Sequence, residues 1–498
     1  MTQLPSTSIP QHGGSPSVQT GLRPLVISGG QWRLPVVFML TLALCGLKFF
    51  PAVFFLIVLL VRAFRTNRYT FTVMLMLSLG CYGITDQATF VVKTFDMMLA
   101  ASLTLFLLMH KTPLVRKLMW LCVAYGVALS AIAMFSIESY FIQILSIRNY
   151  VAICCFIIPV GIFAGEKFEM GKFFDALMPF ALLMCGFYAI DAFIFKGNIL
   201  VPRTFAWGAD SSILHPLMNP FSLAIFRKYP PGMVFIAVAA YPILRYYQLN
   251  WKQWTVVILG LLATTTFTVI LPFLLLYCIA RGLGKYIFVS VGTFIGLFAL
   301  AYFVDSMLPV YTTEDGQEQS TFRIKSSINQ FVRLKSTTEV EELAKFGSGR
   351  MAQLIPNLQL VDEEGKELTG LGFLHEDYTK IARYEIVNVF FTDISKNTIQ
   401  AGIVEINPAQ IYIYAGIAGL IVVYGFYFCT YLMLRKLRYR GLYFCTLFLV
   451  LLMSLGNYAT VSNISSIVSM GFTLGLVCLA NRPEGKVRRK RGNFAWIS

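Results

Sequence analysis

Residues 409–434 read AQIYIYAGIAGLIVVYGFYFCTYLML and contain no charged side chain. An apolar α-helix needs roughly 17 to 25 residues to cross the hydrocarbon core of a bilayer, and this stretch is long enough. Similar stretches recur along the chain of 498 residues, of which 57% are hydrophobic and only 13% are charged. Soluble domains carry about 25% charged residues, so the sequence predicts an integral membrane protein. The apolar residues run continuously and do not alternate with polar ones, which excludes a β-barrel.

The predicted fold class is an all-α membrane protein with about 12–14 transmembrane helices. The candidate spans are residues 34–48, 50–63, 70–84, 94–109, 118–135, 149–165, 173–195, 232–246, 254–266, 268–280, 286–303, 409–434, 441–457 and 463–480. Two regions, 34–63 and 254–280, could each be one tilted helix or a hairpin of two. Hairpins place nearly all clusters of Lys and Arg on one side of the membrane, which is the cytoplasmic side by the positive-inside rule. We therefore expect two helices in each region and both termini in the cytoplasm.

The charge distribution divides the chain further. The net charge is +16, yet residues 304–408 hold 16 acidic and 10 basic residues, so this segment is net −6 and the remainder +22. This segregation predicts a large extracytoplasmic loop domain at 304–408 and makes nucleic acid an unlikely partner. The other predicted parts are a disordered cytoplasmic tail at 1–32, transmembrane helices in 33–303 with an outward loop at 196–231, the last three helices in 409–480, and a basic cytoplasmic tail at 481–498.

Metal and redox chemistry find no support in the sequence. All ten cysteines fall in apolar runs, where they read as small hydrophobic residues. No CxxC or Cys/His cluster occurs, and the four histidines are scattered. We therefore expect no cofactor and no metal site. Few ionisable residues fall inside the predicted spans, which argues against an ion-coupled transporter with a buried proton relay.

The outward loops carry three groups of distinctive residues. The first loop contains Arg203 and Gly208, followed by Asn219-Pro220 before the next span. The second contains Gly347-Ser348-Gly349-Arg350 and later Gly370-Leu371-Gly372. The third group, Gly416-x-x-Gly419, lies in the span after the large loop.

In these residues and in topology the chain resembles the bacterial O-antigen polymerase and ligase family, which are multi-pass glycosyltransferases of the GT-C type. Two positions depart from the pattern of that family. Thr264-Thr265-Thr266 stands where Ser-Arg is common, and Ile406 stands before Asn407 where a histidine is common. The second departure leaves the identity of the catalytic base open.

The resemblance implies a metal-independent transfer of a glycan from undecaprenyl diphosphate to an acceptor sugar hydroxyl, at the outer face of the bacterial inner membrane. Arg203 and Arg350 would hold the diphosphate, because guanidinium forks match phosphate oxygens and stay ionised. Gly347, Gly349, Gly370 and Gly372 would shape the motifs. A turn with a solvated arginine remains an alternative for Arg350, as does a head-group anchor for Arg203. The candidate bases, for which a solvated loop position is the alternative, are His375, Glu376, Asp377 and Glu405.

The predicted function is a repeat-unit polymerase of O-antigen or exopolysaccharide. One alternative is an O-antigen ligase, which shares the donor but transfers the glycan to lipid A core. An alternative of another class is a lipid or polysaccharide exporter without catalysis. The implied partners are the undecaprenyl-diphosphate-linked oligosaccharide, a glycan or lipid A core acceptor, membrane lipids and a chain-length regulator.

Overall fold

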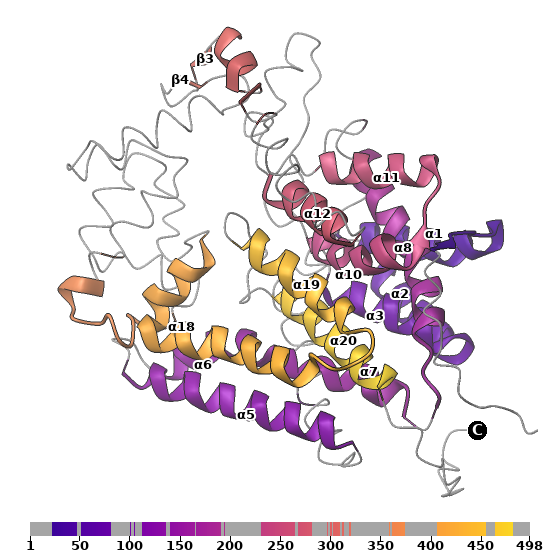
Figure 1. Cartoon of the computed structure of the whole chain (residues 1–498). Helices are drawn as coiled ribbons and strands as arrows, with labels where there is room; N and C mark the ends of the chain where they lie inside the picture. Colours follow the sequence, from indigo (N-terminus) through magenta and orange to yellow (C-terminus); the bar gives the residue numbers. More distant parts are fainter. Residues whose placement is uncertain are drawn as a thin grey trace, which may run out of the picture.

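The computed structural model describes residues 22–46, 51–80, 112–135, 140–164, 166–190, 231–263, 267–280, 302–308, 361–373, 406–454 and 464–481, with short pieces at 100, 104, 194, 296, 299–300, 311–312, 318–319 and 358. These residues are mostly helical, as Figure 1 shows. Among them, three helices are long and apolar enough to cross a membrane: α5 (Pro113–Ala133), α8 (Met170–Ile190) and α18 (Asn407–Leu434). The prediction of a helical chain is confirmed, and these three helices could span a membrane by their length and composition.

The remaining described elements are shorter. The helices are α1 (Gly29–Gly46), α2 (Pro51–Thr66), α3 (Arg68–Gly80), α6 (Tyr140–Val151), the 3-10 helix η2 (Ala152–Phe156), α7 (Ile157–Ile162), α10 (Pro231–Arg245), α11 (Trp251–Leu262), α12 (Phe267–Ala280), α19 (Arg440–Met453) and α20 (Ile464–Ala480). Two pairs of two-residue strands complete the described structure. β1 (Arg23–Pro24) pairs in parallel with β2 (Tyr247–Gln248), and β3 (Tyr311–Thr312) pairs antiparallel with β4 (Glu318–Gln319).

Helix α20 forms the centre of the bundle, where it packs against η2, α7, α19, α3 and α10. Every residue from 466 to 479 is buried, in keeping with a helix that is apolar on all sides. Gly471 and Gly475 allow the close approach of η2, because a Cβ at either position would overlap with atoms of the η2–α7 segment. Small residues four positions apart commonly bring helix backbones together in membranes.

The two regions in which a hairpin was predicted each contain two helices. Residues 34–63 form most of α1 and α2, which pack against each other. Residues 254–280 form most of α11 and α12, and the rings of Trp254 and Tyr277 lie 5.7 Å apart. This contact places the start of α11 beside the end of α12, so the two helices are antiparallel. The prediction of two helices in each region is confirmed.

The predicted span at 149–165 differs most from the structure in its starting point. The span predicted at 149–165 corresponds to the interrupted helix α6–η2–α7, which begins at Tyr140 and ends at Ile162. The prediction started the span at residue 149, directly after Arg148. In the structure Arg148 lies two turns inside the helix, so the apolar segment continues on both sides of the charge.

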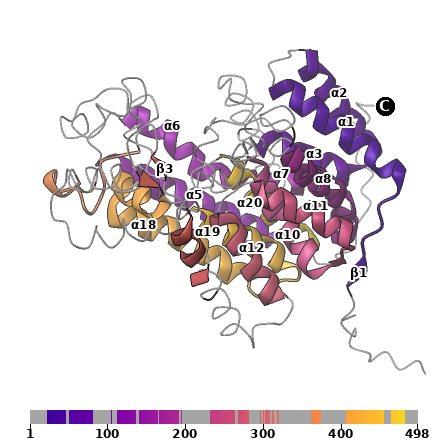
Figure 2. The same cartoon turned by 90° about the horizontal axis from the view of Figure 1, so that it is seen from above.

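Several segments predicted to be cytoplasmic contact one another at one end of the bundle. The main chain of residues 23–25 bonds to that of residues 246–248, and the side chain of Gln253 donates to the carbonyl of Leu25. Figure 2 shows this N-terminal segment at the edge of the bundle next to α11. The Arg245 guanidinium reaches the carbonyl of Ala280, at 3.0 Å. Asn481 makes hydrogen bonds to both main-chain groups of Arg438.

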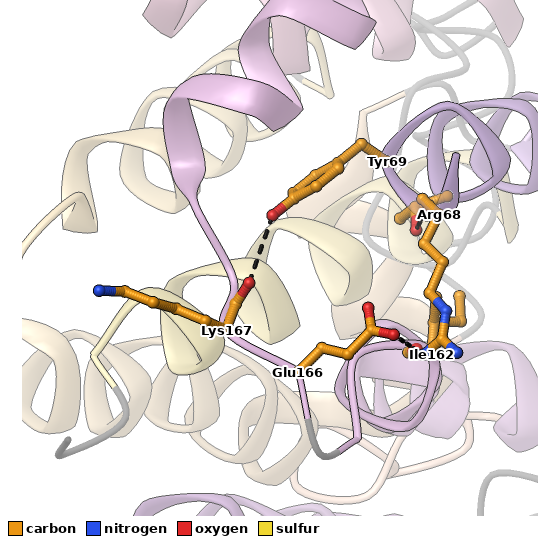
Figure 3. Close-up of polar contacts among 6 residues, drawn as sticks. Arg68, Tyr69, Ile162, Glu166 and Lys167 are labelled. Carbon is orange, nitrogen blue, oxygen red and sulfur yellow. Dashed lines mark hydrogen bonds and ion pairs between the residues drawn. The ribbon is translucent and has the colours of Figure 1, made fainter. Parts of the chain in front are cut away.

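The connection between α7 and α8 belongs to the same end and is drawn in Figure 3. Arg68 donates to the carbonyl of Ile162 at 2.8 Å, and its Nη1 lies 3.1 Å from Glu166. Tyr69 Oη lies between the carbonyl of Lys167 and the amide of Glu169, donating to the first and accepting from the second. Arg68 therefore caps the last turn of α7 with positive charge, as helix C-termini favour. We read this arginine as structural.

Candidate functional site

The most unusual backbone of the described chain lies within α18. Gly416 adopts φ 62° and ψ −160°, a region that only glycine enters readily, and the helix is kinked there. The break separates groups that a continuous helix would join, among them the amide of Ile417 with the carbonyl of Ile413 and the amide of Ala418 with the carbonyl of Tyr414. Backbone groups opened in this way need other partners.

The segment 366–373 supplies those partners. The amides of Leu371 and Gly372 donate to the carbonyls of Ile413 and Tyr414 at 2.8 and 3.0 Å. On the other side of the break, the amides of Ile417 and Ala418 donate to the carbonyls of Glu367 and Leu368 at 2.9 and 3.0 Å. The loop thus inserts its backbone into the helix, and four hydrogen bonds satisfy main-chain groups on both sides of the break.

Glycines on both sides make this insertion possible. Gly370 and Gly372 have φ of 72° and 120°, and a Cβ on Gly370 would overlap with the main chain of Tyr414 and Ala415. A Cβ on Gly416 would overlap with the main chain of residues 368 and 369. The Gly-x-Gly of the large loop and the Gly-x-x-Gly of the following helix, two of the three motif groups found in the sequence, are therefore in direct contact.

Aromatic side chains connect the inserted loop to α6. Phe373 is fully buried, with its ring 5.4 Å from that of Tyr150 and 6.4 Å from that of Tyr414. A chain of side-chain hydrogen bonds, each 3.4 Å long, leads from Asn407 through Gln410 to the hydroxyl of Tyr414. The loop, the start of α18 and the end of α6 therefore form one packed unit.

Helix α6 brings polar groups into this unit. Arg148 and Asn149 are half-buried, and Gln143 is fully buried one heptad before Tyr150, on the same face of the helix. Neither amide atom of Gln143 has a hydrogen-bond partner, and the same holds for Oδ1 of Asn149. Leaving such groups unpaired is costly inside a protein, so each calls for an explanation.

Ser466 of α20 lies at the level of the last turn of α6. Gly471 faces Ile153 and Cys155, and Gly475 faces Phe156 and Pro159, so α20 runs parallel to η2–α7. Five residues before Gly471, Ser466 therefore lies level with the last turn of α6. Its buried hydroxyl also has no hydrogen-bond partner.

Arg148 was not among the residues predicted to be functional. The sequence carried a signal for it, because the eight residues before it, YFIQILSI, are mostly apolar and extend the span toward Tyr140. An ionised side chain inside an apolar span is costly and is therefore usually tied to function. Its presence qualifies the sequence argument that the spans contain few charges. It does not supply a proton relay, because a guanidinium stays protonated.

Most of the predicted site residues lie outside the part of the chain that the structure describes: Arg203, Gly347, Gly349, Arg350, His375, Glu376, Asp377 and Glu405. Gly370 and Gly372 lie inside it and have the contacts given above. In sequence, His375 follows two residues after Phe373, and Glu405 directly precedes Ile406. The candidate bases are therefore close in sequence to Phe373 or Ile406, which both belong to the described structure.

Within the described ranges, no group of three or more His, Cys, Asp or Glu side chains could hold a metal ion. No known family model matches the chain, and no curated protein is significantly similar to it. The chemistry must therefore be argued from the arrangement itself. That arrangement has two parts. The interrupted helix α6–η2–α7 carries Arg148, and the loop 366–373 fills the break of α18 at Gly416. In membrane proteins, interrupted helices are common where polar substrates bind.

Proposed function

We propose that this protein is a metal-independent glycosyltransferase of the GT-C type that spans the bacterial inner membrane many times. It joins lipid-linked oligosaccharides as a polysaccharide repeat-unit polymerase. The observation that carries the proposal is the seating of the Gly370–Gly372 loop in the break at Gly416. That contact unites two of the three motif groups on which the family resemblance rests, although they are far from adjacent in sequence.

The proposed topology has both termini in the cytoplasm and residues 304–408 outside. It is supported by the charge segregation and by the contacts among segments rich in Lys and Arg at one end of the bundle. At the other end, Lys366 of the large loop donates to the carbonyl of Phe135, at 3.0 Å. The amide of Asn407 donates to the carbonyl of Ser454, also at 3.0 Å. The described residues 366 and 407 thus contact the end of the bundle that lies opposite to the contacts among the basic segments, which supports this topology.

The proposed reaction is a single displacement. The acceptor hydroxyl oxygen attacks the anomeric carbon, the bond from that carbon to the diphosphate oxygen breaks, and the lipid diphosphate leaves with the electron pair. The hydroxyl proton passes to His375, Glu376, Asp377 or Glu405. Arg203 and Arg350 stabilise the charge that develops on the leaving group, and removing one such donor typically costs about 10²–10³ in rate. Phe373, which lies two residues before His375 in sequence, is buried in the inserted loop.

Two rival functions use the same site differently. A ligase performs the same displacement with lipid A core as the acceptor. An exporter moves the lipid-linked glycan and forms no glycosidic bond, and Arg148 inside a span would suit such a path for an anionic lipid as well. The three functions therefore differ in the product formed and not in the donor bound.

The decisive experiment reconstitutes the purified chain in vesicles with an undecaprenyl-diphosphate-linked repeat unit and EDTA. A ladder of lipid-linked polymers is expected with the wild-type chain, and no ladder with Arg350→Ala. Transfer only after lipid A core is added would identify a ligase. Movement of the lipid-linked unit across the vesicle without any new bond would identify an exporter, and either result would overturn the polymerase. Loss of the ladder on adding EDTA, with recovery on adding Mg²⁺, would contradict the metal-independent mechanism.

A further inference from the structure

The connection between α18 and α19 is strongly basic. Four of the six residues 435–440 are cations, and all four side chains are exposed: Arg435, Lys436, Arg438 and Arg440. We propose that this basic turn binds the phosphate of an anionic phospholipid whose acyl chains lie along α18. The inference requires that α18 crosses the membrane, and it does not depend on the transfer reaction.

The basic turn has a defined conformation. The side chain of Asn481 accepts a hydrogen bond from the amide of Arg438 at 2.8 Å and donates to its carbonyl at 2.7 Å. Tyr439 has φ 58° and is the one non-glycine residue of the described ranges with positive φ. Its ring lies 6.4 Å from that of Phe174 in α8. Contacts from α8 and from the end of α20 therefore hold the basic turn in place.

The positive charge of the basic turn is not neutralised. Residues 406–483 contain neither Asp nor Glu, and within the described part of the chain none of the four cations forms an ion pair. A fifth cation lies near them, since Arg245 of α10 and Arg438 are both within electrostatic range of the Tyr241 hydroxyl. Like charges gathered in this way attract anions, because their fields add.

The start of α19 also favours an anion. Arg440 is the first residue of this helix, where the positive end of the helix dipole disfavours a cation. No side chain caps the helix, and its first turn holds no acidic residue. A phosphate group suits both features, because it pairs with guanidinium groups and is stabilised at a helix N-terminus.

The phosphate is assigned to a lipid because an exposed apolar stripe leads to the basic turn. Ile421, Phe428 and Leu432 are exposed, and with Arg435 they follow one another at intervals of seven, four and three residues. This spacing places the four side chains on one face of α18. From Ile421 to Arg435 the helix rises about 21 Å, which exceeds the roughly 15 Å of hydrocarbon in one leaflet. Acyl chains on this stripe would thus bring the phosphate to Arg435.

The composition of the basic turn agrees with this assignment. Clusters of at least four Lys and Arg directly after a membrane helix are typical of segments that bind anionic lipids. A soluble anion would gain nothing from the apolar stripe. The basic turn and the stripe together therefore favour an anionic phospholipid as the ligand.

Native mass spectrometry of the purified full-length chain in a nonionic detergent tests the site. With equal amounts of phosphatidylglycerol and phosphatidylcholine as probes, the wild-type chain should bind phosphatidylglycerol more tightly. Arg435→Gln/Lys436→Gln should weaken that binding about 30-fold at the tightest site, since each basic residue near a membrane surface contributes roughly fivefold. Phosphatidylcholine binding should not change. The matched control is Arg116→Gln/Lys117→Gln, which removes two exposed cations of α5 and should bind as the wild type does.

Arg440→Gln keeps the test decisive if the double variant does not fold. Removing a cation from the N-terminus of α19 should leave the unfolding temperature unchanged or slightly higher. The same change should weaken phosphatidylglycerol binding about fivefold. Unchanged binding in either folded variant would overturn the site, and so would an equal loss in the α5 control.

Inorganic phosphate distinguishes a lipid from a soluble anion. In excess over the lipid it should not displace phosphatidylglycerol, because it has no acyl chains to lie on the stripe of α18. Displacement would assign the basic turn to soluble phosphate and overturn the lipid site. None of these measurements involves polymer formation, so the lipid site and the polymerase can each fail while the other stands.

Discussion

Replacing Gly416 by alanine should release the loop 366–373 from α18. In the docked state an alanine would have to keep φ 62° and ψ −160°, which costs about 1–3 kcal/mol for a non-glycine residue. The new Cβ would also overlap with the main chain of Leu368 and Thr369. In the released state α18 can close the hydrogen bonds that the break interrupts, and the strain disappears. Strain alone should thus shift the equilibrium toward release by about 5- to 150-fold.

Trypsin measures this equilibrium at Lys366, whose side chain is half-buried in the docked loop. When loop opening is fast compared with cleavage, the cleavage rate is proportional to the fraction of open molecules. We expect cleavage after Lys366, followed by mass spectrometry in nanodiscs, to accelerate by the same 5- to 150-fold factor, about one decade for each 1.4 kcal/mol. The same variant should lose polymer formation. Residues 366–373, which directly precede the candidate bases in sequence, are then no longer anchored on α18.

Gly425→Ala is the matched control. It lies in the same helix, and a Cβ there would meet nothing within 4 Å. Alanine in a helix interior is favoured over glycine by about 1 kcal/mol, so this variant should be as stable as the wild type or slightly more stable. If Gly416→Ala is cleaved at Lys366 at the wild-type rate, the strain argument and the proposed role of the insertion are both refuted.

Three further predictions concern the site, the topology and the cytoplasmic end. Arg350→Lys should fail nearly as badly as Arg350→Ala in polymer formation, because lysine keeps the charge but not the bidentate geometry; substantial activity with lysine would contradict a guanidinium clamp. Alkaline phosphatase fused at Gly365 should be active and at Ser498 inactive, and the reverse pattern would overturn the topology. Burial, together with the hydrogen bond to Asp175, raises the pKa of Tyr247 above its usual value near 10. Since the folded protein holds this proton more tightly, stability should fall as the pH rises above about 10, and Tyr247→Phe should reduce that fall in thermal unfolding.

The sequence by itself determined the class of structure and much of the helix pattern. Continuous apolar runs and the low charge content indicated membrane helices. Each side chain that faces the hydrocarbon of the bilayer has to be apolar, and this requirement can be seen in the local sequence. The division of residues 34–63 and 254–280 into two helices each could also be predicted, since the placement of Lys and Arg depends on sequence alone. The glycines at 370, 372, 416 and 419 stood out as motif residues for the same reason.

Only the tertiary structure decided what those glycines do. The need for Gly416 arises from the main chain of Leu368 and Thr369, which is distant in sequence and becomes a neighbour only when the large loop folds back on α18. Arg148 was missed for a related reason. A charge within an apolar run looks locally like the end of a span, and what distinguishes it is the packing of α6 against α5, α20 and Phe373. Local composition records contact with lipid, whereas helix breaks and buried polar groups depend on partners brought together by folding.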